Sequence, residues 1–313
     1  MKPFRLARAW ACVLVLAATA CALPSASPRL EAPHEVHVTL RGPAPVALVL
    51  SGGSARGLAH IGVLKVLEEN GLEPDLVVGS SAGAMIGALY ASGLSASQIE
   101  QSLAGLDLSD LAKPVWPRMG AMPGALGFMS SEKLRRYMLA TLPQPLIEDF
   151  PRPFAAVATD LDAGDTARFN AGSAALAVEA STAIPVIVAP VEFGGRRFID
   201  GQVTAPVPVQ AARDLGAARV IAVDVIYPPD ESSVTSPLKV LFQAFLSGIY
   251  RLREMQLKDA DLVITPRIPA TSGQLGLGDR ETLVAAGEAA AREALPRLRT
   301  MMHARTPAAE PSR

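Results

Sequence analysis

The feature that most constrains this chain is a serine set among small residues at a strand-to-helix turn. Residues 79–83 read Gly-Ser-Ser-Ala-Gly, directly after the apolar run 76–78 and directly before the helix-like segment 84–90. A G-x-S-x-G turn forces its serine into a strained, exposed position at a helix N-terminus. The free N–H groups there favour developing negative charge. The pattern predicts Ser81 as a nucleophile, and the alternative is a tight turn that only needs small residues.

Strand-like and helix-like segments alternate along the chain, which is half hydrophobic and carries a net charge of −1. Apolar runs predict strands at 46–50, 76–78, 154–159, 197–199, 219–224 and 262–264. Helical spacing predicts helices at 58–70, 95–112, 131–142, 174–181, 207–214, 237–258 and 279–301. Repeated units of this kind predict one α/β domain with a mostly parallel sheet flanked by helices. The absence of a basic stripe argues against nucleic acid as a partner.

The N-terminus has the pattern of a signal peptide, which we place at residues 1–20. Positive residues in 1–8 precede an apolar core at 9–17, and small residues at 18–20 lead to Cys21. Cleavage before Cys21 resembles processing at a bacterial lipobox, which predicts acylation of that cysteine. The alternative is ordinary cleavage that leaves Cys21 free. Ala22 resembles the residue that follows the cysteine in outer-membrane lipoproteins. We therefore expect an exported lipoprotein of the bacterial outer membrane, with its domain facing the periplasm.

Three further parts of the chain follow from composition. Residues 22–45 contain five prolines and no sustained periodicity, so 21–45 is predicted to be a flexible tether. The folded domain is predicted over 46–302, and the polar tail 303–313 is predicted to be disordered.

A serine nucleophile needs a base, and the histidines offer a poor choice. A Ser-His-Asp triad of the α/β-hydrolase type needs a histidine late in the chain. Two of the four histidines lie in the predicted tether and one in the tail, which leaves His60 on the first helix. Its position favours a structural role with a satisfied ring nitrogen.

Three aspartates follow predicted strands, where open α/β sheets place functional groups. They are Asp160, Asp200 and Asp224. Burial would raise the pKa of such a carboxylate and make it a better base. Each is also a reasonable turn or capping residue. The residues alone place Asp200 first, because it follows an apolar strand and precedes Gly201.

A glycine-rich loop follows the first predicted strand. Gly52 and Gly53 allow backbone N–H groups to point at a ligand, and Arg56 adds a fixed positive charge. A phosphate-binding loop is the competing interpretation, but the Gly-Lys-Ser/Thr ending and a complete G-x-G-x-x-G are missing.

Several blocks in register resemble the patatin-like phospholipases. They are the glycine loop and following helix at 50–64, the serine turn at 79–83, Ala-Thr-Asp-Leu at 158–161, residues 180–185, and Asp-Gly at 200–201. The resemblance covers about residues 45–300 and implies a three-layer α/β/α fold. It implies a Ser–Asp dyad with Ser81 as nucleophile and Asp200 as general base, and no metal or organic cofactor. The implied oxyanion hole consists of Gly52, Gly53 and Ser54, supported by Arg56.

Two positions depart from the family pattern. Ser54 stands where the family usually has a third glycine, and Gln202 stands at the third position of its D-G-G/A block.

The resemblance implies a lipid acyl hydrolase of the phospholipase A or lysophospholipase type that forms an acyl-enzyme. The expected partners are membrane lipids or lysolipids as substrates, with membrane anchoring through Cys21 and no nucleic acid. One alternative is an acyltransferase, in which an alcohol replaces water. Another is a lipid-binding lipoprotein whose catalysis is weak.

Two segments are candidates for lipid contact. The helix predicted over 237–258 carries a broad apolar face, which either packs on the sheet or faces lipid. The loop predicted over 113–129 contains Trp116 and several methionines and is a candidate for acyl-chain contact.

Overall fold

The computed structural model describes residues 30–38, 40, 44–104, 131–228, 236–268 and 280–303. The chain divides into residues 1–30 and a second unit, 31–313, to which the following description is confined. Its strands are β1 (Val46–Leu50), β2 (Leu76–Ser80), β3 (Phe154–Asp160), β4 (Thr166–Phe169), β5 (Val191–Phe193), β6 (Arg196–Asp200), β7 (Arg219–Val223) and β8 (Leu262–Ile264). Its helices are α1 (Leu58–Glu69), α2 (Ala82–Ala91), α3 (Ala96–Ala104), α5 (Glu132–Thr141), α6 (Ala174–Ser181), α7 (Val209–Asp214), α8 (Pro237–Gln256) and α9 (Arg280–His303).

The strands of the described residues form one mixed sheet in the order β5-β6-β3-β2-β1-β7-β8, with β4 also paired to β3. The five strands from β3 to β8 in this order are parallel, as the alternation of strands and helices predicts. β4 and β6 run antiparallel to β3, and β5 runs antiparallel to β6. The sequence did not predict β4 or β5, which are short and lie toward one edge of the sheet.

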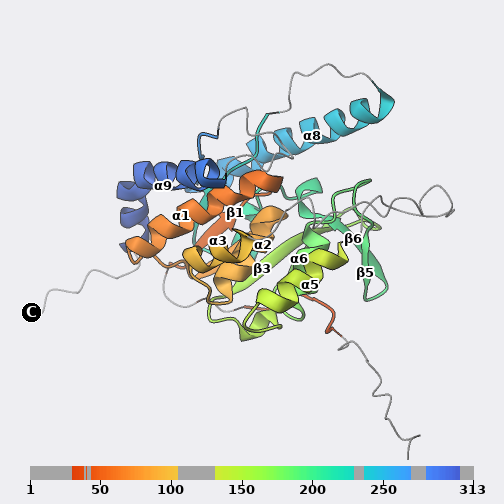
Figure 1. Ribbon diagram of the computed structural model, residues 1–313, viewed down its shortest axis with the longest axis horizontal. Coiled ribbons are helices and arrows are strands. Elements are labelled where there is room, and N and C mark those ends of the chain that lie inside the picture. The colour runs from red at the N-terminus through yellow and green to blue at the C-terminus, as the bar shows by residue number, and fades with distance from the viewer. Residues whose placement is uncertain are drawn as a thin grey trace, which may run out of the picture. The chain divides into compact units, whose positions relative to one another are not determined.

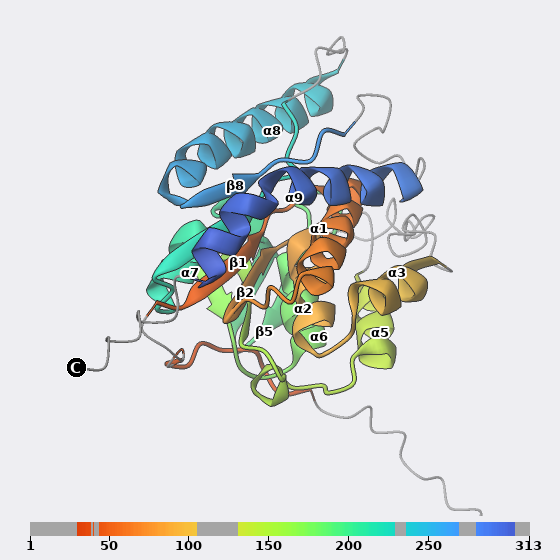
Figure 2. The ribbon, with the colours of Figure 1, turned by 90° about the vertical axis from the view of Figure 1, so that its left-hand side faces the viewer.

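Helices cover both faces of the sheet, so the unit has three layers (Figures 1 and 2). The central strands are buried throughout, because alternate residues of each strand point into different apolar clusters. The larger cluster joins the sheet to α1, α2, α6 and α9. The smaller cluster joins the other face to α7 and to Ile249 of α8. This is the predicted three-layer α/β/α architecture.

Part of the predicted tether packs on the domain. The backbone of His34 pairs with Ala171, and the amide of Asn170 binds Val36 through both of its polar atoms at 2.8 Å. Arg168 bridges Glu35 and Asp214. Residues 31–38 therefore belong to the folded unit, which differs from the expectation of a flexible tether over 21–45 and a domain that begins at Val46. The local sequence of this segment did not reveal these contacts, because the partner residues lie far away along the chain.

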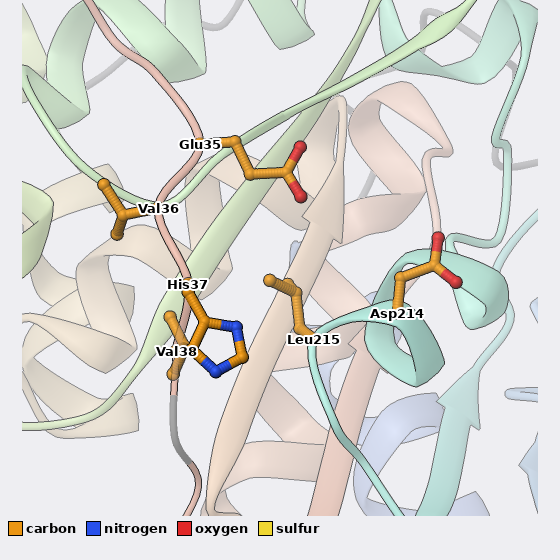
Figure 3. Close-up of a pocket in the computed structure, with 6 residues that line it drawn as sticks. All are labelled: Glu35, Val36, His37, Val38, Asp214 and Leu215. Carbon is orange, nitrogen blue, oxygen red and sulfur yellow. The ribbon is translucent and has the colours of Figure 1, made fainter.

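This N-terminal segment lines a cavity of about 440 Å³ together with the end of α7 (Figure 3). The lining residues are Glu35, Val36, His37, Val38, Asp214 and Leu215. Neither Ser81 nor Asp200 is among them. Within the described residues, no helix is both long enough and apolar enough to cross a membrane.

Helices α1 and α9 approach each other closely through two glycines. A Cβ on Gly62 would overlap the carbonyl oxygen of Val284, and a Cβ on Gly287 would overlap the carbonyl oxygen of Ala59. Both obstructing atoms belong to the backbone, so a side chain at either glycine would push the helices apart.

We predict that Gly62→Ala lowers the free energy of unfolding by roughly 1–3 kcal/mol, because the helices must separate. Gly248→Ala is a matched control, since Gly248 is also helical but has open space around its Cα. The control should be neutral or stabilising by about 0.5–1 kcal/mol. Urea unfolding followed by circular dichroism measures both. Equal changes in the free energy of unfolding for the two substitutions would contradict the close approach of α1 and α9.

Candidate active site

Ser81 lies between β2 and α2, at the turn that the sequence predicted. Its backbone has φ 53° and ψ −122°, a conformation that side-chain-bearing residues rarely adopt. The two flanking glycines make this turn possible. A Cβ on Gly79 would overlap the carbonyl of Gly83, and a Cβ on Gly83 would overlap the carbonyl of Leu50. The strand and helix are therefore as close as a backbone-to-backbone contact allows. Ser81 itself is buried, whereas its position on a sharp turn had predicted exposure.

The hydroxyl of Ser81 donates a hydrogen bond of 2.7 Å to Oδ2 of Asp200. Asp200 is the last residue of β6, which pairs antiparallel with β3, so the end of this strand is brought beside the serine turn. The second carboxylate oxygen, Oδ1, accepts the backbone N–H of Gln202 at 2.8 Å. Both oxygens are thus held, and the carboxylate is oriented toward the serine.

Burial raises the pKa of Asp200 to about 7, although the hydrogen bonds from Gln202 and Ser81 oppose that shift. An ordinary aspartate is almost fully ionised at neutral pH and is a poor proton acceptor. With its pKa near neutrality, Asp200 combines a deprotonated population with appreciable basicity. The arrangement can therefore transfer the serine proton to the carboxylate.

A second serine holds the backbone of the turn. The N–H of Ser81 donates to Oγ of Ser181 at 2.9 Å, and Ser181 donates to the carbonyl of Val157 at 2.5 Å. Ser181 ends α6 and is fully buried. Sequence reasoning assigned no role to Ser181, although it lies within the block at 180–185. A small polar residue in a buried helix was the available signal.

Some backbone N–H groups of the glycine loop donate hydrogen bonds within the protein, and others have no acceptor among the described residues. Gly52 donates its N–H to the carbonyl of Pro206 at 3.0 Å, so this group is not directed at a ligand. The N–H groups of Gly53 and Ser54 donate to no other described residue. The loop lies against the start of α2, because a Cβ on Gly57 would overlap Cβ of Ala82. Of the three predicted donors, Gly53 and Ser54 therefore remain as candidates.

Ser54 adopts φ 50°, in the left-handed region that favours glycine. A serine there is strained by roughly 1 kcal/mol relative to glycine. The backbone nevertheless takes a conformation that glycine adopts readily. The substitution at this position therefore leaves the direction of the loop N–H groups compatible with the family pattern.

Arg56, in the turn that follows Gly53, stacks on an aromatic ring rather than projecting freely. Its guanidinium carbon is 4.3 Å from the centre of the Tyr227 ring, and the side chain is buried. Burial lowers the pKa of Arg56, and Tyr227 opposes this shift. The stacked guanidinium fixes a positive charge beside the loop.

Gln202, the other departure from the family pattern, packs across the loop. Its side chain occupies the space where a Cβ on Gly52 would lie. The segment that carries Asp200 is thereby in direct contact with the loop that carries Gly53.

The competing bases have structural partners. His60 is fully buried and donates from Nε2 to the carbonyl of Ser51 at 2.9 Å, and burial lowers its pKa to about 4. Asp160 accepts the N–H groups of Asp162 and Ala163 and pairs with Arg196. Asp224 is fully buried and pairs with Arg253. His60 thus supports the glycine loop, and the two aspartates are turn or ion-pair residues.

Several predicted features cannot be placed. Cys21 and the loop 113–129 lie outside the described residues, as do residues 304–313. Among the residues that are described, no group of three or more His, Cys, Asp or Glu side chains is arranged to hold a metal ion.

Comparison with known proteins places this geometry in a family. A model of the family described as patatin-like phospholipase matches residues 48–213, which is more than half of the chain. An uncharacterized NTE family protein of Mycobacterium tuberculosis is 34% identical over 196 residues, which are 63% of this chain and 53% of that protein. Lysophospholipase nte1 of Aspergillus fumigatus is 31% identical over 213 residues, which are 66% of this chain and 13% of that protein.

Among solved structures, VipD from Legionella pneumophila has a TM-score of 0.50 at 16% identity, over 86% of this chain and 70% of that one. This likeness concerns the fold alone. The chain spans about half the length of its mycobacterial relative. The match of the family model, together with the fold, leads to one conclusion: the chain belongs to the patatin-like phospholipase family.

Proposed function

We propose that the protein hydrolyses acyl esters of lipids, with Ser81 as the nucleophile and Asp200 as the general base. The observation that carries this proposal is the 2.7 Å hydrogen bond from the Ser81 hydroxyl to a buried carboxylate whose pKa is about 7. A nucleophile hydrogen-bonded to an oriented base is the arrangement that acyl transfer requires.

In the first step, Ser81 Oγ attacks the ester carbonyl carbon as its proton passes to Oδ2 of Asp200. The negative charge on the former carbonyl oxygen is met by N–H groups of Gly53 and Ser54 and by the positive end of α2. Collapse of this intermediate breaks the ester bond, and the proton on Asp200 passes to the leaving alcohol. The acyl group is then bonded to Ser81.

In the second step, Asp200 accepts a proton from water, and the resulting hydroxide equivalent attacks the acyl-enzyme. The proton returns to Ser81 as the fatty acid leaves. One carboxylate thus acts first as base and then as acid in each half-reaction. His60 is assigned no step, because its Nε2 donates to the carbonyl of Ser51 and the Ser81 hydroxyl is bonded to Asp200 instead.

Membership of a phospholipase family and similarity to a protein named lysophospholipase support phospholipids or lysophospholipids as the substrate class. The loop conformation supports an active enzyme over a lipid-binding protein that has lost catalysis, since Ser54 keeps the positive φ that glycine would favour at this position.

We predict that Ser81→Ala and Asp200→Asn each lower lysophospholipid hydrolysis by about 10⁴-fold or more, because nucleophile and base act as a unit. Ser81→Ala should also abolish labelling by a fluorophosphonate probe. Ser80→Ala is the matched control, since the Ser80 hydroxyl is buried and has no hydrogen-bond partner among the described residues. Circular dichroism checks that each variant is folded. Hydrolysis retained by either dyad variant would rule out the mechanism.

We predict that kcat/KM rises with pH and levels off above an apparent pKa of about 7, because only ionised Asp200 accepts the serine proton. This rise with pH does not arise from deprotonation of His60, because the pKa of His60 is about 4. A soluble short-chain ester is the appropriate substrate, since its own state does not change in this range. A flat profile from about pH 5 to about pH 8 would contradict the assignment.

The same ionisation affects folding. The pKa of Asp200 is higher in the folded protein, about 7, than the ordinary aspartate value of 3.8. The folded state therefore binds the proton more tightly, and the contribution to stability falls as pH rises between these values. Asp200→Asn should remove this contribution to the pH dependence of urea unfolding.

We further propose that the protein is exported and anchored in the bacterial outer membrane through acylated Cys21, with its catalytic domain facing the periplasm. The charged, apolar and small-residue regions of 1–20 support this, together with Cys21 and Ala22.

Expression in a bacterium with an outer membrane, followed by mass spectrometry, should find an N-terminus at Cys21 that carries diacylglycerol and an acyl chain. Cys21→Ala should release the protein from the membrane fraction. An unmodified Cys21 in the mature protein would contradict the anchor.

A further inference from the structure

The two halves of α8 differ in how they are held. Toward its C-terminus, Ile249 is buried against the sheet, Arg253 pairs with Asp224, and Gln256 bonds to Val207 and Thr204. Toward its N-terminus, the helix reaches away from the other labelled elements, as both views show (Figures 1 and 2). The sequence offered two roles for this helix, packing on the sheet or facing lipid. Its two halves match one role each.

Three consecutive large apolar residues in the N-terminal half are exposed. Their exposed fractions are 56% for Val240, 59% for Leu241 and 36% for Phe242. Successive residues in an α-helix are separated by about 100° around the axis, so these three span about 200° of the helix surface. A partner protein that takes a helix in a groove contacts a single stripe at i, i+3, i+4 and i+7. Apolar exposure over so wide an arc instead fits contact with lipid, which can surround this part of the helix.

The distribution of charged residues along α8 also favours contact with lipid. From Pro237 to Tyr250 the only charged side chain is Lys239, and there is no acidic residue. The next residues, from Arg251 to Lys258, contain both signs of charge. An apolar segment with a single cation and no acid suits an anionic lipid surface, and the charged segment suits the adjoining water. A helix with one apolar half and one charged half is expected to lie at the membrane interface.

We infer that the N-terminal half of α8, residues 237–248, inserts into the surface of a lipid bilayer and holds the domain against its substrate. The inference rests on the proposed function in one respect, that the substrate is a membrane lipid.

The fixed half of α8 connects this surface to the active site. Arg253 of α8 binds Asp224. Val225, which follows Asp224 in the chain, packs against Gly53 of the glycine loop. Gln256 binds the backbone at Thr204 and Val207, in the segment that follows Asp200. Membrane contact at one end of the helix therefore fixes the orientation of the site that the other end contacts.

The insertion is tested by placing an environment-sensitive fluorophore at Leu241→Cys in the full chain, with Cys12 and Cys21 replaced by serine. Vesicles of phosphatidylethanolamine and phosphatidylglycerol should shift its emission to the blue. The matched position is Met255→Cys, which is 63% exposed on the same helix but about 21 Å farther along it. This probe should not shift. Equal shifts, or none at either position, would overturn the inference.

The consequence for activity is tested with Leu241→Glu and its control Met255→Glu. Leu241→Glu should lower hydrolysis of vesicle phospholipid by roughly tenfold or more, since a leucine that inserts into the lipid is replaced by a charged side chain. Hydrolysis of a soluble short-chain ester should be unchanged. Met255→Glu should leave both activities unchanged. Unchanged vesicle hydrolysis by Leu241→Glu would count against the inference.

Two other outcomes are distinguishable. A wild-type protein that cleaves no ester, yet shows the blue shift at position 241, would refute the proposed function and leave the insertion supported. A shift at position 241 that depends on protein concentration without vesicles, with dimers seen by light scattering, would identify a second copy of the chain as the partner and overturn the lipid assignment.

Discussion

The close approach of backbone to backbone around the serine turn is the constraint on which the rest of the site depends. Gly79 and Gly83 let β2 and α2 meet without side chains between them, and the carbonyl of Leu50 fills the remaining space. This compression sets the unusual φ of Ser81, and it places the serine at the N-terminus of α2 beside the glycine loop. The hydroxyl then meets Asp200 only because β6 returns antiparallel along β3 and ends at the same level.

Three strand-end aspartates show how partners decide chemistry. Asp160 and Asp224 each pair with an arginine, which favours the ionised carboxylate, although burial of Asp224 outweighs Arg253 and raises its pKa. Asp200 has a serine hydroxyl and a backbone N–H instead, and burial keeps its pKa near neutrality. Of the three carboxylates, Asp200 is the one that accepts a serine hydroxyl, and it is therefore the proposed base.

The fold class was predicted from local patterns in the sequence, whereas the pairing of Ser81 with Asp200 was predicted only with the help of the family resemblance. Apolar runs followed by glycines located β1, β2 and the turn at Ser81, and Asp200 was favoured by its place at the end of an apolar run. What decided among the aspartates was not local, since Arg196 and Arg253 are 36 and 29 residues away from their partners. For the same reason the bond from Gly52 to Pro206 and the packing of residues 31–38 could not be foreseen. The short strands β4 and β5 exist through pairing with β3 and β6, which their own few residues do not signal.

The contact between Gln202 and Gly52 has a consequence for how such a site changes through mutation. Because the glutamine side chain fills the space above the glycine, a side chain at residue 52 would require the side chain of Gln202 to move aside. Substitutions at the two positions are therefore expected to be energetically coupled, although the positions are far apart along the chain and belong to different motifs. A shorter residue at 202 would leave space over Gly52 for such a side chain, so the shape of the loop surface can change without any change to Ser81 or Asp200.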